Sequence, residues 1–281
     1  GVDNIDLEAA TIAGILVCNT PGSSTQSVVE LTIGHLLAST RHIPAADRDL
    51  RNGLWTKKSL KGTELSGKRI GFIGFGRIAQ GVGQVARSLG MELHAYDPYL
   101  PVEVANQHKC QLHDEVEDIF RTCTHISVHC NLTDETHHLI NSKTLSLMPG
   151  VGADGIACGN HLVSCARGGI VDEDALHTAL TSGEIRAAGL DVLLDEPSSA
   201  DHPLFKLKNI ILSPHIAGVT VESTQRMATQ TVDNVLPNAA TFCAESEANE
   251  AHLVAPCYEP AKTTSPAVAL SCLYCTCLLY T

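Results

Sequence analysis

The sequence predicts an α/β fold built on a doubly wound parallel sheet, with helices on both faces. Three observations favour this fold: short apolar segments recur along residues 69–212, helical spacing separates them, and a glycine-rich turn follows the first of them. Strands that alternate with helices in this way form right-handed βαβ units. The chain has 281 residues, of which 44% are hydrophobic, so it can bury a sizeable core.

Individual elements follow from periodicity and from the residues that bound them. Short apolar runs between turn residues predict strands at Arg69–Ile73, Glu92–Tyr96, His125–His129, His161–Cys165, Ala187–Val192 and Asn209–Leu212. Helical spacing of apolar residues predicts helices at Arg77–Leu89, Ser142–Leu147 and Glu173–Thr181, and Asp172 is placed to cap the last. Two longer helices are expected on either side of this block, at Thr25–Arg41 and Val221–Leu236, each with an apolar face.

Composition excludes several classes of protein. The net charge is −12 and no long basic run occurs, which argues against a nucleic-acid partner or an anionic membrane surface. The sequence contains no uninterrupted run of about 18 apolar residues, so it predicts no transmembrane helix. The 11 cysteines are irregularly spaced, so we expect reduced thiols in a cytoplasmic protein rather than a disulfide framework or a metal site.

The glycine-rich turn is the first motif that predicts chemistry. Gly74, Gly76 and Ala79 fit G-x-G-x-x-G/A between a predicted strand and a helix, where the backbone and the helix N-terminus can hold a pyrophosphate. Asp97 ends the next strand, where its carboxylate can accept from a ribose 2′-OH. A 2′-phosphate would be repelled there, so the motif predicts a Rossmann-type domain that binds NAD in preference to NADP.

Three charged or titratable residues form the second signal, because each follows a predicted strand. They are Arg167, Glu196 and His215. Singly they have ordinary interpretations, as a surface ion-pair partner, a solvated turn residue and a capping or core histidine. Ligands of open α/β sheets bind beyond the carboxyl ends of strands, so together the three predict a site for oxidising a 2-hydroxy acid.

The same segments carry a resemblance to a known family, the D-isomer-specific 2-hydroxyacid dehydrogenases. The match extends from Gly1 to about Leu236 and rests on Gly1–Asp6, Asn19–Pro21, the glycine motif with Arg77 and Ile78, Asp97-Pro98, Ala166–Glu173, Leu190–Val192 with Glu196-Pro197, and Pro214–Gly218. The segment Gly62–Lys68 further resembles the D-3-phosphoglycerate dehydrogenases within that family.

The resemblance implies a role for each residue. Arg167 would hold the substrate carboxylate, His215 would be the acid/base, and Glu196 would pair with His215 and raise its pKa. Asp191 would contact the nicotinamide carboxamide, and Asp97 would bind the adenosine ribose. Together with these two, the cofactor-binding residues would be Gly74, Gly76, Arg77, Ile78, Cys165, Ala166, Ala217 and Gly218.

The activity implied is NAD-dependent oxidation of 3-phospho-D-glycerate to 3-phosphohydroxypyruvate, the chemistry that serine biosynthesis uses. The alternatives are a glyoxylate or hydroxypyruvate reductase, and an NAD-sensing corepressor-type binding protein of the same fold. We expect a homodimer or tetramer that acts on a small 2-hydroxy or 2-oxo acid.

The resemblance also implies an organisation. Residues 1–24 would be the remnant of a flavodoxin-like substrate lobe, residues 25–220 the NAD-binding domain, and residues 221–236 a helix returning to the substrate lobe. Residues 237–281 lie beyond the resemblance and have no apolar periodicity, so we expect a disordered or non-native tail there. The chain would then be a fragment without the first part of that lobe. Two departures from the family stand out: Cys130 at the expected cofactor wall, and a glycine-rich surplus around Val151–Asn160 that we expect to disturb the Arg167 strand.

Overall fold

The computed structural model describes residues 5–246, and their side chains as far as Leu236. Contacts divide the chain into two units. The larger unit is residues 25–218, and the smaller one contains the described residues on either side of it.

A parallel sheet of seven strands, in the order β3-β2-β1-β4-β5-β6-β7, forms the centre of the larger unit. The strands are β1 Arg69–Ile73, β2 Glu92–Tyr96, β3 Cys110–His113, β4 His125–Val128, β5 His161–Ser164, β6 Ala187–Leu190 and β7 Ile210–Leu212. All six predicted strands are confirmed, and β3 is the one the sequence did not reveal. From β1 the chain moves outward to β3, then returns to β4 on the other side of β1, so strand order reverses between β1 and β4.

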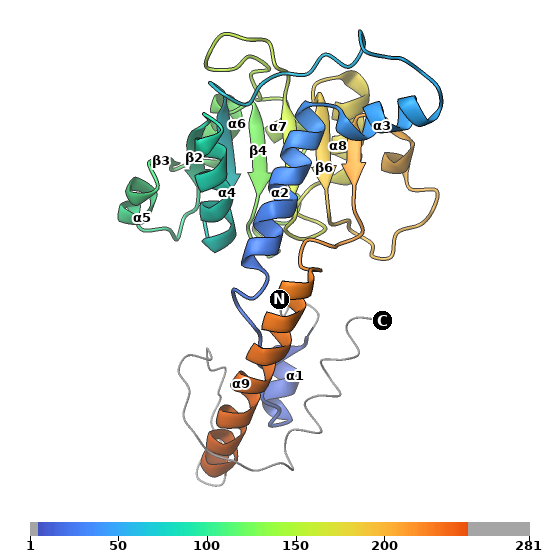
Figure 1. Ribbon diagram of the computed structural model, residues 1–281. Coiled ribbons are helices and arrows are strands. Elements are labelled where there is room, and N and C mark those ends of the chain that lie inside the picture. The colour runs from blue at the N-terminus through green and yellow to red at the C-terminus, as the bar shows by residue number, and fades with distance from the viewer. Residues whose placement is uncertain (1–4, 247–281) are drawn as a thin grey trace. The chain divides into compact units, whose positions relative to one another are not determined.

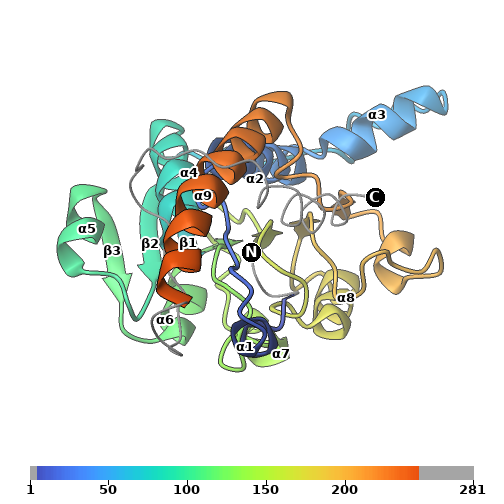
Figure 2. The same ribbon diagram turned by 90° about the horizontal axis from the view of Figure 1, so that it is seen from below.

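Helices cover both faces of this sheet, as Figures 1 and 2 show. They are α2 Thr25–Thr40, α4 Arg77–Ser88, α5 Val102–Gln107, α6 Val116–Thr122, α7 Ser142–Leu145 and α8 Glu173–Ser182, with a 3₁₀ turn at Pro203–Lys206. Helix α3 Ile43–Arg51 packs against α2 and has no buried residue. One apolar core joins α2 and α4 to the sheet, with Phe72 and Val82 fully buried in it. A second core lies under α6, α7 and α8, where Phe120 and Leu176 are buried. Two cores on opposite faces confirm the doubly wound α/β fold.

Helix α2 is covered by the larger unit itself. It packs against α4 and against β5 and β6. Val29 and Leu36 of its predicted apolar face are buried, and a side chain at Gly81 of α4 would stand 2.7 Å from Val29. The larger unit therefore supplies the cover for this face of α2. Its buried side also includes polar residues, among them His35.

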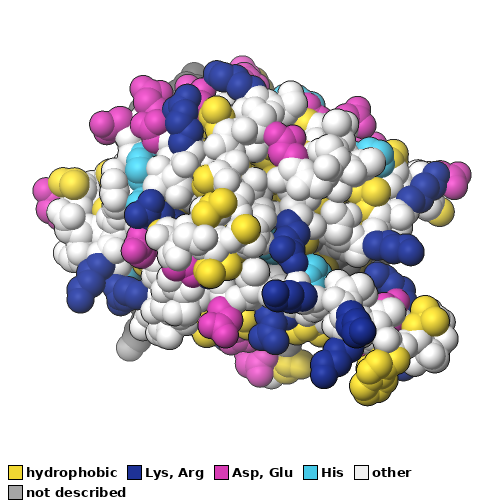
Figure 3. Space-filling model, turned by 90° about the horizontal axis from the view of Figure 1, so that it is seen from above, with side chains coloured by type: hydrophobic (Ala, Val, Ile, Leu, Met, Phe, Trp, Pro, Cys, Tyr) yellow, Lys and Arg dark blue, Asp and Glu magenta, His cyan; other side chains and the backbone are white. Residues whose placement is uncertain are grey.

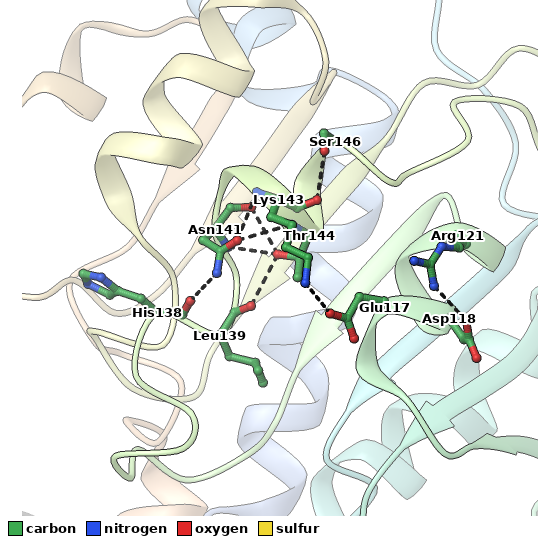
Figure 4. A network of polar contacts seen from close by, with 9 residues as sticks. All are labelled: Glu117, Asp118, Arg121, His138, Leu139, Asn141, Lys143, Thr144 and Ser146. Atoms are coloured by element: carbon green, nitrogen blue, oxygen red, sulfur yellow. Dashed lines mark hydrogen bonds and ion pairs between the residues drawn. The ribbon is translucent and has the colours of Figure 1, made fainter.

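The short helix α7 is held by a capping box at its first turn (Figure 4). The Asn141 side chain accepts from the backbone N–H groups of Lys143 and Thr144, and the Thr144 hydroxyl accepts from the Asn141 N–H at 2.9 Å. Lys143 also pairs with Glu117 of α6 at 2.9 Å. These reciprocal bonds satisfy the amides that a helix N-terminus leaves open, which allows so short a helix to form.

The surplus segment Val151–Asn160 forms a small hairpin before β5. Val151 bridges Ala157, and the Gly152 N–H donates to the Ile156 carbonyl at 2.8 Å. Asp154 at its tip accepts from the ammonium of Lys68, whose side chain is only 3% exposed, at 2.5 Å. The segment therefore lies at the amino ends of the strands, and the expectation that it disturbs the Arg167 strand end was wrong.

The smaller unit contains α1 Leu7–Ile12, capped by Asp6, and α9 Val221–Ser246. Arg226 Nε donates to the Ser23 carbonyl at 2.8 Å, and Asn234 donates to the Asn19 carbonyl at 2.9 Å. Helix α9 therefore returns to the unit formed by the chain's first residues. It continues to Ser246 rather than ending at Leu236, so residues 237–246 are helical where a tail was expected. Residues 247–281, the rest of that tail, lie outside the described residues.

Candidate active site

The predicted site residues all follow the carboxyl ends of parallel strands, so one edge of the sheet brings them together. The glycine turn follows β1, Asp97 follows β2, Arg167 follows β5, Asp191 and Glu196 follow β6, and His215 follows β7. The strand order reverses between β1 and β4, which is where open α/β sheets form a ligand crevice.

The glycine turn is shaped for close approach of another group. Gly74 has a φ of +82°, and a Cβ there would lie 2.9 Å from the backbone nitrogen of Cys130, so only glycine fits. Gly76 begins α4 as a cap without a side-chain hydrogen bond, and a Cβ there would meet nothing within 4 Å. The first amides of α4, at Arg77 and Ile78, therefore face open space at the positive end of the helix dipole, which suits a pyrophosphate.

Asp97 braces this turn. One of its carboxylate oxygens accepts from the Phe75 N–H at 2.8 Å, and the other accepts from the Tyr99 N–H at 3.0 Å. A carboxylate has about four lone-pair positions, so acceptors remain for a diol. The glycines, the helix terminus and this half-buried carboxylate together fit the adenosine half of NAD.

The loops after β5 and β6 touch through their backbones beside Arg167. A Cβ at Gly168 would fall 1.9 Å from the Leu193 carbonyl oxygen, so glycine is required there. Arg167 is half-buried and donates to the carbonyl of Ala166 at 2.8 Å. The close approach of Gly168 to Leu193 fixes the position of the Arg167 loop relative to the loop that carries Glu196.

His215 and Glu196 form a close pair. The His215 Nδ1 lies 2.6 Å from Glu196 Oε2, while Glu196 Oε1 accepts from the Leu193 N–H at 3.0 Å. His215 has a φ of +53°, a strained conformation for a residue with a side chain, and its N–H donates to the Asp191 carbonyl at 2.7 Å. The ring is therefore held at Nδ1, and its side chain is 46% exposed at this edge of the sheet.

Asp191 lies beneath this pair rather than at an open surface. It is 1% exposed, and its carboxylate accepts from the Ser213 hydroxyl at 2.5 Å, from the Ile216 N–H at 3.0 Å and from the Ala217 N–H at 2.7 Å. Asp191 therefore anchors the Pro214–Gly218 loop that carries His215. This contact to the loop was not foreseen from the sequence, which suggested only a contact to nicotinamide.

The remaining predicted cofactor residues line the same edge, with Cys165, Ala166 and Ala217 all buried. Burial raises the pKa of the Cys165 thiol to about 12, so it remains protonated. Cys130, doubtful from the sequence, does lie at the switch point beside Gly74. Among the described residues, no group of three His, Cys, Asp or Glu side chains could hold a metal ion, and no helix could span a membrane.

Comparison with known proteins agrees with this geometry. Residues 33–217 match the family model of the D-isomer specific 2-hydroxyacid dehydrogenase, NAD binding domain. The chain is 45% identical to a D-3-phosphoglycerate dehydrogenase of Methanocaldococcus jannaschii over 81% of its own length and 42% of the relative's. It is 40% identical to a hydroxypyruvate reductase of Thermotoga maritima, over 84% of this chain and 74% of that one.

Solved structures show the same fold. A glyoxylate reductase from Paecilomyes thermophila superimposes with a TM-score of 0.75 at 30% identity, covering 84% of this chain and 68% of that one. The chain spans less than half the length of the Methanocaldococcus relative. With the family match over all seven strands of its sheet and the glycine turn in place, the chain belongs to the D-isomer-specific 2-hydroxyacid dehydrogenases and carries their NAD-binding domain.

Proposed function

We propose that this protein oxidises 3-phospho-D-glycerate to 3-phosphohydroxypyruvate with NAD. The observation that carries the proposal is the His215–Glu196 pair at 2.6 Å, on the sheet edge that also bears Arg167 and the glycine turn. Relatives named D-3-phosphoglycerate dehydrogenase support this substrate, and the Thermotoga relative supports hydroxypyruvate as the second candidate.

Each residue has a part in the proposed reaction. NAD, when bound, supplies the hydride acceptor. His215 takes the proton from the C2 hydroxyl at its Nε2, and Glu196 stabilises the imidazolium that results. Arg167 binds the substrate carboxylate as a charged clamp. Asp97 binds the adenosine ribose, and its carboxylate favours NAD over NADP because a 2′-phosphate would add a like charge.

The test has a binding arm and a turnover arm. NADH binding is measured through energy transfer from Trp55, the chain's single tryptophan, and turnover is followed by NADH absorbance with phosphoglycerate, hydroxypyruvate and glyoxylate. Arg167→Ala should lower kcat/KM by roughly a hundredfold, the scale of a lost charge clamp, while the matched control Arg121→Ala on α6 leaves it unchanged. NADH binding without turnover of any of the three acids would favour an NAD-sensing binding protein instead.

We further propose that the protein is a homo-oligomer of the cytoplasm. Helix α3 and the segment after it expose apolar side chains that the chain itself leaves in solvent: Ile43 is 54% exposed, Leu50 57%, Leu54 52% and Trp55 82%. Figure 3 shows yellow side chains among Lys and Arg on one face. The buried thiols of Cys110, Cys123 and Cys158 suit a reducing compartment. Light scattering of Trp55→Ser against the unaltered chain tests the assembly; equal masses would refute a role for Trp55.

A further inference from the structure

His35 of α2 reaches the loop that carries His215 through a chain of partly buried hydrogen bonds. Its Nε2 lies 2.9 Å from the Ser213 hydroxyl, and that hydroxyl donates to Asp191 at 2.5 Å. Asp191 in turn accepts the amides of Ile216 and Ala217, the two residues that follow His215. The relay therefore links a helix on one face of the sheet to the loop of the proposed acid/base.

Proton counting fixes the direction of this relay. The Ser213 hydroxyl has one proton, and an ionised carboxylate can only accept, so that proton goes to Asp191. The Ser213 oxygen must then accept from His35, which makes Nε2 the protonated ring nitrogen. Burial also lowers the pKa of His35, which favours the neutral ring over the imidazolium.

The other ring nitrogen shows that packing alone does not explain His35. The residue is 4% exposed, and its Nδ1 has no hydrogen-bond partner among the described residues. An unsatisfied buried nitrogen is costly, and an apolar side chain would avoid that cost. The one interaction that only a polar ring supplies here is the donor to Ser213.

Gly189 of β6 makes room for the imidazole. A Cβ at Gly189 would lie 2.8 Å from both Cβ and Nδ1 of His35, so the ring lies directly against a strand backbone that has no side chain there. The imidazole therefore packs against β6 on one side and is hydrogen-bonded to Ser213 on the other. Such confinement gives the relay a single geometry.

From this arrangement we infer that His35 is a positioning residue for the active site. By donating to Ser213 it commits the Ser213 proton to Asp191, which orients the Asp191 carboxylate to hold the amides of Ile216 and Ala217. The inference deepens the proposed function and rests on it only for the consequence that cofactor binding and turnover depend on this loop. The contacts themselves can be tested without either.

A pair of polar substitutions separates the relay from packing. A glutamine amide can place its nitrogen where Nε2 stands, whereas an asparagine amide reaches only as far as Nδ1. We expect His35→Gln to preserve the amide proton shifts of Ile216 and Ala217, and His35→Asn and His35→Leu to move them. NADH affinity should fall about fivefold to tenfold in these two, the worth of one lost hydrogen bond. The melting temperature of the His35→Leu variant should not fall along with its NADH affinity, since the substitution also removes the unsatisfied Nδ1.

Two further comparisons make the result decisive. Ser39→Ala on the same buried side of α2, where the hydroxyl donates only to the Leu36 carbonyl, should leave amide shifts and NADH affinity unchanged. In a Ser213→Ala background, His35→Leu should have no further effect, because the relay is already broken. Additive effects, or unchanged amide shifts in both His35→Leu and His35→Asn, would overturn the inference. If the unaltered chain binds no NADH, the proposed function fails while the shifts still decide the relay.

Discussion

Acidification from about pH 7 to about pH 5 should destabilise this protein through histidines that its sheet holds neutral. Burial lowers the pKa of His94 and of His161 from 6.5 to about 4, and that of His125 further. His125 and His161 stack with ring centroids 4.7 Å apart, and each has one ring nitrogen without a partner among the described residues. A proton added there has no acceptor to stabilise it.

The sign follows from proton binding. Below pH 6.5 the unfolded chain protonates these histidines while the folded chain keeps them neutral, so stability is complete above that pH and is lost as the pH falls toward 4. At about pH 5 the shift of the nearly fully buried His161 to about 4 is worth on the order of 2 kcal/mol, and His94 adds to the loss in the same direction. That loss is appreciable against the 5–15 kcal/mol typical of a domain.

Urea unfolding at both pH values measures this loss directly. His161→Phe retains a flat ring on β5 but cannot titrate, so it should reduce the pH-dependent loss by roughly 2 kcal/mol. His177→Phe on the half-buried side of α8 is the matched control and should leave the loss unchanged. If His161→Phe unfolds with the same pH dependence as the unaltered chain, the buried imidazoles are not its cause.

Three further perturbations test the site and the hairpin. Gly168→Ala should abolish turnover, because its Cβ would meet the Leu193 carbonyl at 1.9 Å; full activity in a steady-state assay would contradict that contact. Asp97→Ala should reduce a preference for NAD over NADP of at least about tenfold, the worth of a hydrogen bond and a charge clash, and equal affinities in the unaltered chain would disprove the role. Asp154→Asn should lower the melting temperature by leaving the buried Lys68 ammonium without its counter-charge, and Lys68→Met should restore it; no shift in a thermal melt would count against the pair.

The sheet was predictable because its strands are apolar runs with clear boundaries. β1 and β2 match their predicted limits, since both are buried for most of their length and end at turn residues. β3 escaped prediction because it is a four-residue edge strand with one fully buried position. Helix α3 escaped because it is short, buries none of its side chains and carries no regular apolar spacing. It also begins after His42, whose left-handed backbone cannot be predicted from the sequence.

The candidate site was predictable in outline because parallel strands bring their carboxyl ends to one edge. That rule alone grouped Arg167, Glu196 and His215. The relay was not predictable, since the contact between His35 and Ser213 joins residues 178 positions apart and His35 occupies a helix whose apolar periodicity suggested only core packing. The anchoring role of Asp191 depends on backbone amides, which leave no mark in the sequence.

The hairpin at Val151–Asn160 has a practical consequence for protein engineering. Its tip is exposed at Ala153 and Gly155, and it lies at the sheet edge opposite the glycine turn and His215. Because the ion pair between Asp154 and Lys68 holds the hairpin against the residues before β1, a dye or an affinity tag attached at Ala153 would have a fixed position on the molecule. Such a handle leaves the reacting edge free, so surface immobilisation and single-molecule observation become possible without obstructing cofactor exchange.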